Sequence, residues 1–238
     1  MRNVRAILRR ELIGSFGQPI ALVALAVFLG AVALFTLWFD DVFVGGVASM
    51  RRPFAWMSVC LAVFAPAVTM RAVADERRTG TLHVLATMPV TSFQIIVAKW
   101  LAAVILVAIA LGLTLTWPLA LAWFGDLDPG PVLAGYLGLF LAGSAMAAVG
   151  VAASSSTESQ VSAFLLAVVA TGLPWLVGYA LPLVPRPWLG VVNYLTFEYH
   201  FANLAVGVLD SRSIVFFASV TALGLRFATH ALEQRRLA

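Results

Sequence analysis

Charged residues are scarce in this sequence, which contains a single lysine and a single cysteine. Only 11% of its 238 residues are charged, whereas soluble domains average about 25%. Cys60 has no second cysteine to pair with, so a disulfide within the chain is excluded. Lys99 stands in the sequence Val-Ala-Lys-Trp and not in the Gly-Lys-Ser/Thr motif of a phosphate-binding loop. The chain therefore cannot hold ATP in a P-loop of its own.

The sequence also lacks the common catalytic and metal-binding motifs. It has no His-Glu-x-x-His pattern and no Gly-x-Ser-x-Gly nucleophile elbow. The three histidines, His83, His200 and His230, are scattered, so we expect no metal site and no catalytic residue in this chain. The centres of the long apolar stretches carry no ionisable group, which argues against an ion-coupled transporter.

Long apolar stretches dominate what remains, because 62% of the residues are hydrophobic and the mean hydropathy is +0.98. A helix needs about 20 apolar residues to cross a bilayer. In lipid, the backbone N–H and C=O groups of such a stretch have no water to bond, so the stretch must form a helix that pairs them internally. The sequence predicts an all-α polytopic membrane protein, a single transmembrane domain over residues 1–238. The expected spans are residues 20–39, 54–74, 93–124, 131–153, 161–181 and 213–232.

Prolines and small residues add detail to these spans. Pro131 suits the first turn of the fourth helix, whereas Pro118 and Pro174 lie inside spans and should kink them. The fourth span also carries a ridge of small residues, which allows helices to approach closely in lipid. This ridge is explained either by packing within the subunit or by a dimer seam. It consists of Ala134, Gly138, Ala142, Ser144, Ala148 and Ala152.

Basic residues lie beside the spans, the pattern of a membrane protein rather than of a nucleic-acid-binding one. With the amino terminus inside, ten basic residues fall on the inner side and four on the outer side. This bias predicts that both termini are cytoplasmic. The inner residues are Arg2, Arg5, Arg9, Arg10, Arg71, Arg77, Arg78, Lys99, Arg235 and Arg236, and the outer ones are Arg51, Arg52, Arg186 and Arg212.

The segment 75–91, between the second and third spans, is the most informative loop. It reads as a helix extension, a break at Gly80, a short helix capped by Thr81, and a stop at Pro89. Thr91 then begins the third span with Gln94 three residues later, as in a capping box. Two interpretations remain: a basic turn that fixes topology, or a short helix on the inner face that docks into a partner.

The same segment resembles a known signature. Asp75-Glu76-Arg77-Arg78-Thr79-Gly80-Thr81-Leu82, followed by Leu85, Pro89-Val90 and Lys99, resembles the E-x-R-x-G-T … L … P … K pattern of ABC-2 type transporter permeases. In that family the stretch forms a coupling helix that contacts the ATPase subunit. The resemblance implies that Asp75, Glu76, Arg77, Arg78, Thr79, Gly80, Thr81, Leu82, Leu85 and Pro89 couple this chain to an ABC ATPase.

The resemblance also carries expectations about partners and location. ATP and Mg²⁺ would bind to the separate ATPase, and this chain would hold no cofactor. A second permease copy or a paralogue would complete a dimer in the bacterial cytoplasmic (inner) membrane, among membrane lipids and with no nucleic acid. His83 stands where acidic residues are common in the family, a difference that could tune the choice of partner.

The amino-terminal segment 1–18 is predicted to be an amphipathic helix lying on the membrane surface. Val4, Ile7, Leu8 and Leu12 fall mostly on one face. The ABC-2 permeases have such a helix before the first span, and a simple basic topology anchor is compatible with the same pattern. Its basic residues are Arg2, Arg5, Arg9 and Arg10.

The segment 183–212 is too polar for a span and too apolar for a plain loop. Its motif Tyr199-His200-Phe201 … Gly207-Val208-Leu209-Asp210 resembles the outer segment of the gliding-motility and nitrous-oxide-reductase-maturation (NosY-like) permeases. We expect short helices dipping into the outer leaflet. An interfacial aromatic belt would consist of Trp188, Tyr194, Phe197, Tyr199 and Phe201.

Glu198, Tyr199 and His200 are the weak candidates for an outer gate. They could also touch a periplasmic or other extracytoplasmic component. The alternative is that Glu198 and His200 are interfacial residues satisfied by headgroups and water.

Taken with the resemblance, these features predict the membrane-spanning subunit of an ABC transporter, and export is the expected direction. Two alternatives stay open. The first is an intramembrane enzyme acting on lipids, for which Asp126, Asp128, Glu198 and His200 would have to converge. The second is a membrane scaffold that an ATPase drives without transport.

Overall fold

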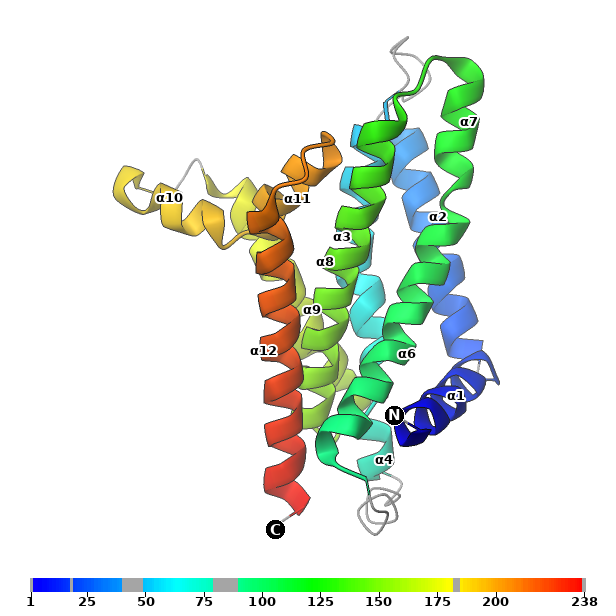
Figure 1. Cartoon of the computed structure of the whole chain (residues 1–238), viewed down its shortest axis with the longest axis vertical. Helices are drawn as coiled ribbons and strands as arrows, with labels where there is room; N and C mark the ends of the chain where they lie inside the picture. Colours follow the sequence, from blue (N-terminus) through cyan, green and yellow to red (C-terminus); the bar gives the residue numbers. More distant parts are fainter. Residues whose placement is uncertain (1, 18, 40–48, 79–89, 182–184, 237–238) are drawn as a thin grey trace.

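The structure is a computed structural model that describes residues 2–17, 19–39, 49–78, 90–181 and 185–236. In this part of the chain every regular element is helical, and the long helices form a bundle (Figure 1). The helices are α1 (Arg2–Gly17), α2 (Pro19–Trp38), α3 (Arg51–Thr69), α4 (Ala74–Arg78), α6 (Ser92–Leu113), α7 (Thr116–Phe124), α8 (Pro129–Ser156), α9 (Gln160–Tyr179), α10 (Arg186–Tyr194), α11 (Phe197–Ala205) and α12 (Ser211–Arg236).

Six segments of the described chain are long and apolar enough to cross a membrane, which confirms the all-α polytopic prediction. Each overlaps one expected span, with ends that differ by a few residues. They are Pro19–Trp38, Arg51–Arg78, Ser92–Trp123, Pro129–Ser156, Gln160–Gly178 and Ser211–Gln234. The second segment is not a continuous helix to residue 74, because α3 ends at Thr69 and a turn precedes α4.

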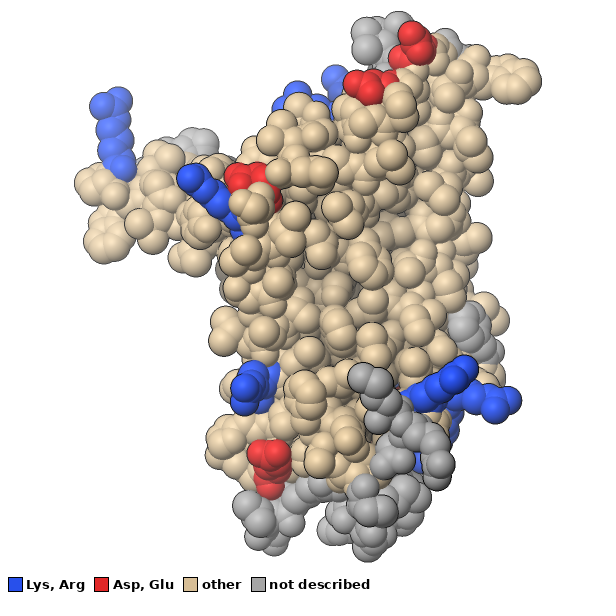
Figure 2. Space-filling model, in the orientation of Figure 1, with Lys and Arg blue, Asp and Glu red and all other residues tan. Residues whose placement is uncertain are grey.

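The bundle has two chemically distinct ends. The base holds α1, α4 and the carboxyl-terminal end of α12, and both chain termini lie there (Figure 1). The top holds the α7–α8 connection together with α10 and α11. On the face drawn in Figure 2 the charged side chains gather toward these two ends, and the middle is free of them. This distribution is the one expected when the middle faces hydrocarbon.

Helix α8 is the centre of the bundle and packs against α3, α6, α9, α11 and α12. Its small residues permit this, because a Cβ on Gly143 would lie 2.7 Å from Val107 Cγ1, and one on Gly150 would collide with the hydroxyl of Thr69. The whole predicted ridge from Ala134 to Ala152 is buried within the single chain. Packing within the subunit therefore accounts for the ridge, and a dimer seam is not needed.

Two prolines within helices lack the N–H that would donate to the carbonyl four residues earlier, and a hydroxyl from a neighbouring helix donates to that carbonyl instead. Pro66 in α3 cannot donate to the Ala62 carbonyl, which accepts from the Thr171 hydroxyl of α9 at 2.9 Å. Pro118 likewise has no N–H to donate to the carbonyl of Thr114, which lies one turn earlier in the chain. That carbonyl accepts from the Tyr136 hydroxyl of α8 at 2.9 Å.

The sequence predicted a kink at Pro118, and the third span is divided near this residue into α6 and α7. Pro174 lies inside α9, which continues past it, and Pro66 was not anticipated as a helix breaker. Pro131 lies in the first turn of α8, but that helix begins two residues earlier than expected. Its start is capped by the Asp128 carboxylate, which accepts from the Gly130 N–H at 3.0 Å.

Candidate functional site

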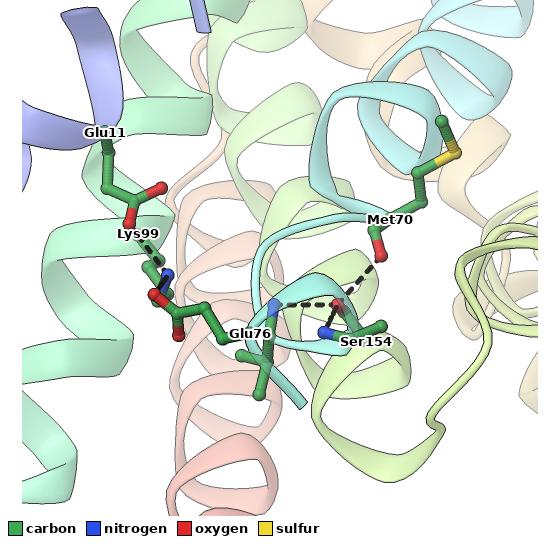
Figure 3. Close-up of polar contacts among 7 residues, drawn as sticks. Glu11, Met70, Glu76, Lys99 and Ser154 are labelled. Atoms are coloured by element: carbon green, nitrogen blue, oxygen red, sulfur yellow. Dashed lines mark hydrogen bonds and ion pairs between the residues drawn. The ribbon is translucent and has the colours of Figure 1, made fainter. Parts of the chain in front are cut away.

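The segment after α3 is attached to the end of α8 by one serine hydroxyl. Ser154 Oγ accepts from the backbone N–H groups of Val73 at 3.0 Å and Ala74 at 3.1 Å, and it donates to the Met70 carbonyl at 3.0 Å (Figure 3). Ser154 is fully buried. These N–H groups belong to the start of α4, where a helix has donors without internal partners. A residue about 80 positions away in sequence thus caps α4.

Polar side chains of the same segment also bind the α8–α9 turn. The Arg77 guanidinium donates to the carbonyls of Ser155 at 2.6 Å and Thr157 at 3.3 Å. A positive charge is favourable there, because carbonyls at the end of a helix carry partial negative charge. At the start of α9, the Gln160 side-chain amide accepts from Arg71 Nε at 3.1 Å and donates to the Asp75 carboxylate.

On its other side, α4 is held by a buried ion pair. Lys99 Nζ of α6 lies 2.8 Å from Glu76 Oε1 and 2.8 Å from Glu11 Oε1 of α1 (Figure 3). The Lys99 side chain is 2% exposed, whereas those of Glu76 and Glu11 are 14% and 26% exposed. A buried charge is tolerated when it is paired and hydrogen-bonded. Lys99 therefore ties α1, α4 and α6 to one point.

Together these contacts form what we call the base network: Glu11, Arg71, Asp75, Glu76, Arg77, Lys99, Ser154 and Gln160. It joins α1, α4, α6, α8 and α9 through hydrogen bonds and ion pairs. Directional contacts of this kind fix the relative position of the elements they join. The arrangement thus links α4 to α1, α6, α8 and α9 through polar contacts.

The predicted coupling residues fall into three groups. Asp75, Glu76 and Arg77 belong to the base network, and Arg78 is exposed at the end of α4. The remaining predicted coupling residues, with the glycine break and the short second helix, lie outside the described residues. They are Thr79, Gly80, Thr81, Leu82, Leu85 and Pro89. Beyond them the predicted cap of the third span is confirmed, because Thr91 Oγ1 accepts from the Gln94 N–H at 3.3 Å.

The amino-terminal segment is a helix, as predicted, and it packs against α2 and α6. Arg5, Arg9 and Arg10 are exposed, and the Arg2 side chain is outside the described residues. The apolar side chains on the opposite face are half-buried, and Ile7 packs against a buried cluster at the base.

Two network residues were not recognised from the sequence. Ser154 and Gln160 lie at the ends of the polar stretch Ala-Ser-Ser-Ser-Thr-Glu-Ser-Gln, which reads as a plain turn between two spans. The sequence did contain one indication of their role: several hydroxyl and amide side chains cluster beside apolar helices, where each needs a hydrogen-bond partner. Sequence spacing alone does not reveal that the partner is α4.

At the top, the structure corrects the interpretation of His200. Its side chain is 1% exposed, so headgroups and water do not satisfy it. Instead its Nε2 lies 2.9 Å from the Tyr194 carbonyl and its Nδ1 lies 3.3 Å from the Ser213 hydroxyl. The ring stacks on Phe216 with a centroid distance of 4.0 Å. Burial lowers the pKa of His200, against the opposing effects of the Tyr194 carbonyl and the Asp210 charge.

The neighbouring gate candidates are more open. Glu198 and Tyr199 are half-buried, and the Glu198 carboxyl lies against Gly178 of α9. Desolvation raises the pKa of Glu198. The three candidates share one short helix, α11, which packs on α8, α9 and α12.

The predicted aromatic belt is only partly correct. Trp188 is 64% exposed and Tyr194 is 45% exposed, as a belt requires. Phe197 and Phe201 are instead buried in the core of the bundle. They lie four residues apart on α11, so they share the face that packs against the long helices.

A catalytic or metal-binding arrangement is not evident in the described part of the chain. No group of three or more His, Cys, Asp and Glu residues there is placed to hold a metal ion. Of the carboxylates suggested for a lipid-acting enzyme, Asp128 caps α8. His200 is enclosed by aromatic rings and hydrogen-bonded within the protein.

The sequence matches a known protein family. No curated protein matches the sequence significantly. The model of the family described as ABC-2 family transporter protein matches residues 52–209, from the start of α3 to the segment before α12. This match covers more than half of the chain and includes the described part of α4 with most of the base network. The chain therefore belongs to the ABC-2 family of transporter proteins and is a multi-pass membrane subunit of a transporter.

Proposed function

We propose that this chain is the membrane-spanning subunit of an ATP-driven ABC-2 exporter. Separate ATPase subunits bind ATP and Mg²⁺ and supply the energy, and a second permease copy or a paralogue completes a dimer. Family membership supports the ATPase partner in general. The segment 183–212, with its short helices α10 and α11, is consistent with the gliding-motility and NosY-like branch of the family.

The observation that carries this proposal is the base network. Closure of the ATPases would displace residues 71–90, and α4 would pass the displacement on through its polar contacts. Ser154 and Arg77 connect α4 to α8 and the α8–α9 turn, and Lys99 connects it to α6 and α1. The bundle would then change between two states, each with its own set of helix contacts.

The proposed location is the bacterial cytoplasmic membrane, with the base and both termini in the cytoplasm. The excess of arginine at the base supports this orientation. The dimer contact is proposed for the most exposed apolar helices. Within the chain, only 22% of the most apolar stretch of α9 and 28% of those of α2 and α12 are buried, against 61% for α8.

A serine pair provides the test of coupling. The tagged chain is purified from its native membranes in mild detergent, and the complex is reconstituted in lipid nanodiscs. Ser154→Ala should uncouple the ATPase, so that ATP hydrolysis continues while its stimulation by the permease falls severalfold. Ser155→Ala is the matched control, because this buried hydroxyl bonds only the Ala152 carbonyl of its own helix in the described structure. Equal behaviour of the two variants would contradict the proposed mechanism.

A labelling experiment tests orientation and separates the rival functions. In a Cys60→Ala background, Arg78→Cys at the base should react with a membrane-impermeant maleimide only after cell lysis. Leu209→Cys at the top, which is also exposed, should react in intact cells. The opposite pattern, or purification without any nucleotide-hydrolysing chain, would overturn the ATP-driven assignment. A complex that hydrolyses ATP yet moves no solute would favour the scaffold.

A further inference from the structure

A cavity at the base lies between α1 and the bundle, next to the base network. Its volume is about 240 Å³, which is below the range of about 300–1,000 Å³ typical of drug-sized ligands. Residues from α1, the first turn of α2, the end of α3, α4 and α6 line it. The cavity can therefore accept a small polar group, with the rest of a larger molecule remaining outside.

One wall of the cavity is ionic and electrically balanced. It is formed by Arg10, Arg71 and Lys99 together with Glu11, Asp75 and Glu76. Among the described residues of the lining, three side chains are positive and three are negative, so together they give no net attraction for an anion or a cation. They suit a ligand that carries both charges, since each charge meets an opposite partner within a few ångströms.

Another part of the cavity lining is apolar and made largely of small side chains. It contains Ala21, Ala67, Val68, Ala102, Ala103 and Leu106 from α2, α3 and α6. These helices belong to candidate membrane spans, whereas α1 is amphipathic and precedes the first of them. The cavity thus has the polarity gradient of the membrane interface, from charged groups to hydrocarbon, within one site.

We propose that this cavity binds the headgroup of a zwitterionic phospholipid with a primary ammonium, phosphatidylethanolamine. The phosphate lies toward Arg10, and the ammonium donates hydrogen bonds to the carboxylate wall that includes Glu11. The glycerol backbone and the start of an acyl chain follow the alanine-lined wall. A lipid in this place contacts α1, α4 and α6 at once, so its occupancy braces the base network.

The headgroup chemistry distinguishes this lipid from its common alternatives. Phosphatidylcholine has a quaternary ammonium and cannot donate an N–H hydrogen bond to a carboxylate. Phosphatidylglycerol carries a net negative charge, for which the balanced wall offers no compensating excess of positive charge. The site should therefore prefer phosphatidylethanolamine to both.

Lipid binding is measured directly on the purified full-length chain. The delipidated protein is titrated in detergent with the three phospholipids, which carry identical acyl chains, and bound lipid is counted by native mass spectrometry. The wild-type chain should retain one phosphatidylethanolamine about tenfold more tightly than either alternative. Equal retention of all three, or preference for phosphatidylglycerol, would overturn the assignment. No ATPase partner takes part, so the result is independent of the proposed transport function.

Two glycines of α1 provide a matched pair of variants. A Cβ on Gly14 or on Gly17 meets no atom within 4 Å, but only Gly14 lines the cavity. Gly14→Trp should fill the cavity and weaken binding of phosphatidylethanolamine at least about tenfold, whereas Gly17→Trp should leave it unchanged. Unchanged binding in Gly14→Trp would place the lipid elsewhere.

A second pair of variants tests the site if Gly14→Trp disturbs folding. Arg10 lines the cavity, and its neighbour Arg9 does not, although both are exposed arginines of α1. Arg10→Gln should weaken binding about threefold, the effect of losing one accessible charge contact, and Arg9→Gln should not. Equal effects of the two substitutions would indicate a general surface attraction and would overturn the cavity site.

Discussion

The base and the top of the bundle hold their short helices in different ways. At the base, α4 is fixed by charged and hydroxyl groups whose hydrogen bonds have defined directions. At the top, α11 is held largely by ring faces and edges around His200, and α10 projects beyond the bundle (Figure 1). Directional contacts resist sliding, whereas apolar contacts permit small shifts at little cost. Under the proposed function, such a base would transmit motion and such a top would accommodate it.

The largest expected effect is at the ion pair of the base. Lys99→Met leaves Glu76 and Glu11 without their shared cation in a poorly solvated site. Removing one partner of a buried ion pair costs about 3–5 kcal/mol, so thermal unfolding in detergent should shift strongly downward. The double variant Lys99→Met/Glu76→Gln should recover part of this loss. A stability of Lys99→Met equal to wild type would mean that the pair does not hold α4.

The next largest effect on stability is expected at Arg77 of α4, with the adjacent Arg78 as the comparison. Arg77→Met removes charge-assisted hydrogen bonds to the end of α8 and should cost about 1.5–3 kcal/mol in stability. Arg78→Met is the matched control: this arginine is exposed, so the substitution should change stability by less than about 0.5 kcal/mol. The comparison is made by thermal unfolding of both variants. Similar losses would show that general charge, and not the contact with α8, matters at this position.

At the top, acid should loosen the packing around His200. Burial lowers its pKa, so between the ordinary value of about 6.5 and the folded value the unfolded chain binds a proton that the folded chain does not. The free energy of unfolding must then fall as pH falls through this window, by about 1.4 kcal/mol per pH unit at most. His200→Gln should flatten the dependence of the melting temperature on pH. An unchanged slope would show that His200 does not titrate as proposed.

The smallest effect is expected for α10. Trp188 is 64% exposed and no residue of this helix is buried, so Trp188→Ala should change stability in detergent by less than about 0.5 kcal/mol. Phe201→Ala on α11 is the contrasting variant, because this ring is buried in the core and its loss should cost about 3–5 kcal/mol. A large loss for Trp188→Ala would mean that α10 is held as firmly as the base.

Hydropathy was sufficient to predict the six spans, because each long uncharged run can satisfy its backbone in lipid only as a helix. It could not show which helix faces the core. Phe197 and Phe201 were assigned to an interfacial belt, although their side chains face the bundle. An aromatic residue suits both environments, and only the position of the neighbouring helices decides between them.

The site was predictable only in part, for a similar reason. The charges of α4 stand out in the sequence, so Asp75, Glu76 and Arg77 were recognised. Ser154 was not, since its role depends on three backbone groups about 80 residues away. Likewise, the sequence around Pro66 did not indicate that the Thr171 hydroxyl would donate to the Ala62 carbonyl in place of the missing proline N–H. Contacts that join distant parts of a chain leave no local pattern.

The enclosure of α8 has an evolutionary consequence. None of residues 142–155 is exposed, and neighbouring helices leave no room for added volume at Gly143 or Gly150. By contrast, α2 presents large aliphatic side chains on its surface, where fluid acyl chains can adapt to any shape. Homologues should therefore keep glycine, alanine and serine along α8 while their first span drifts freely among leucine, valine, isoleucine and phenylalanine.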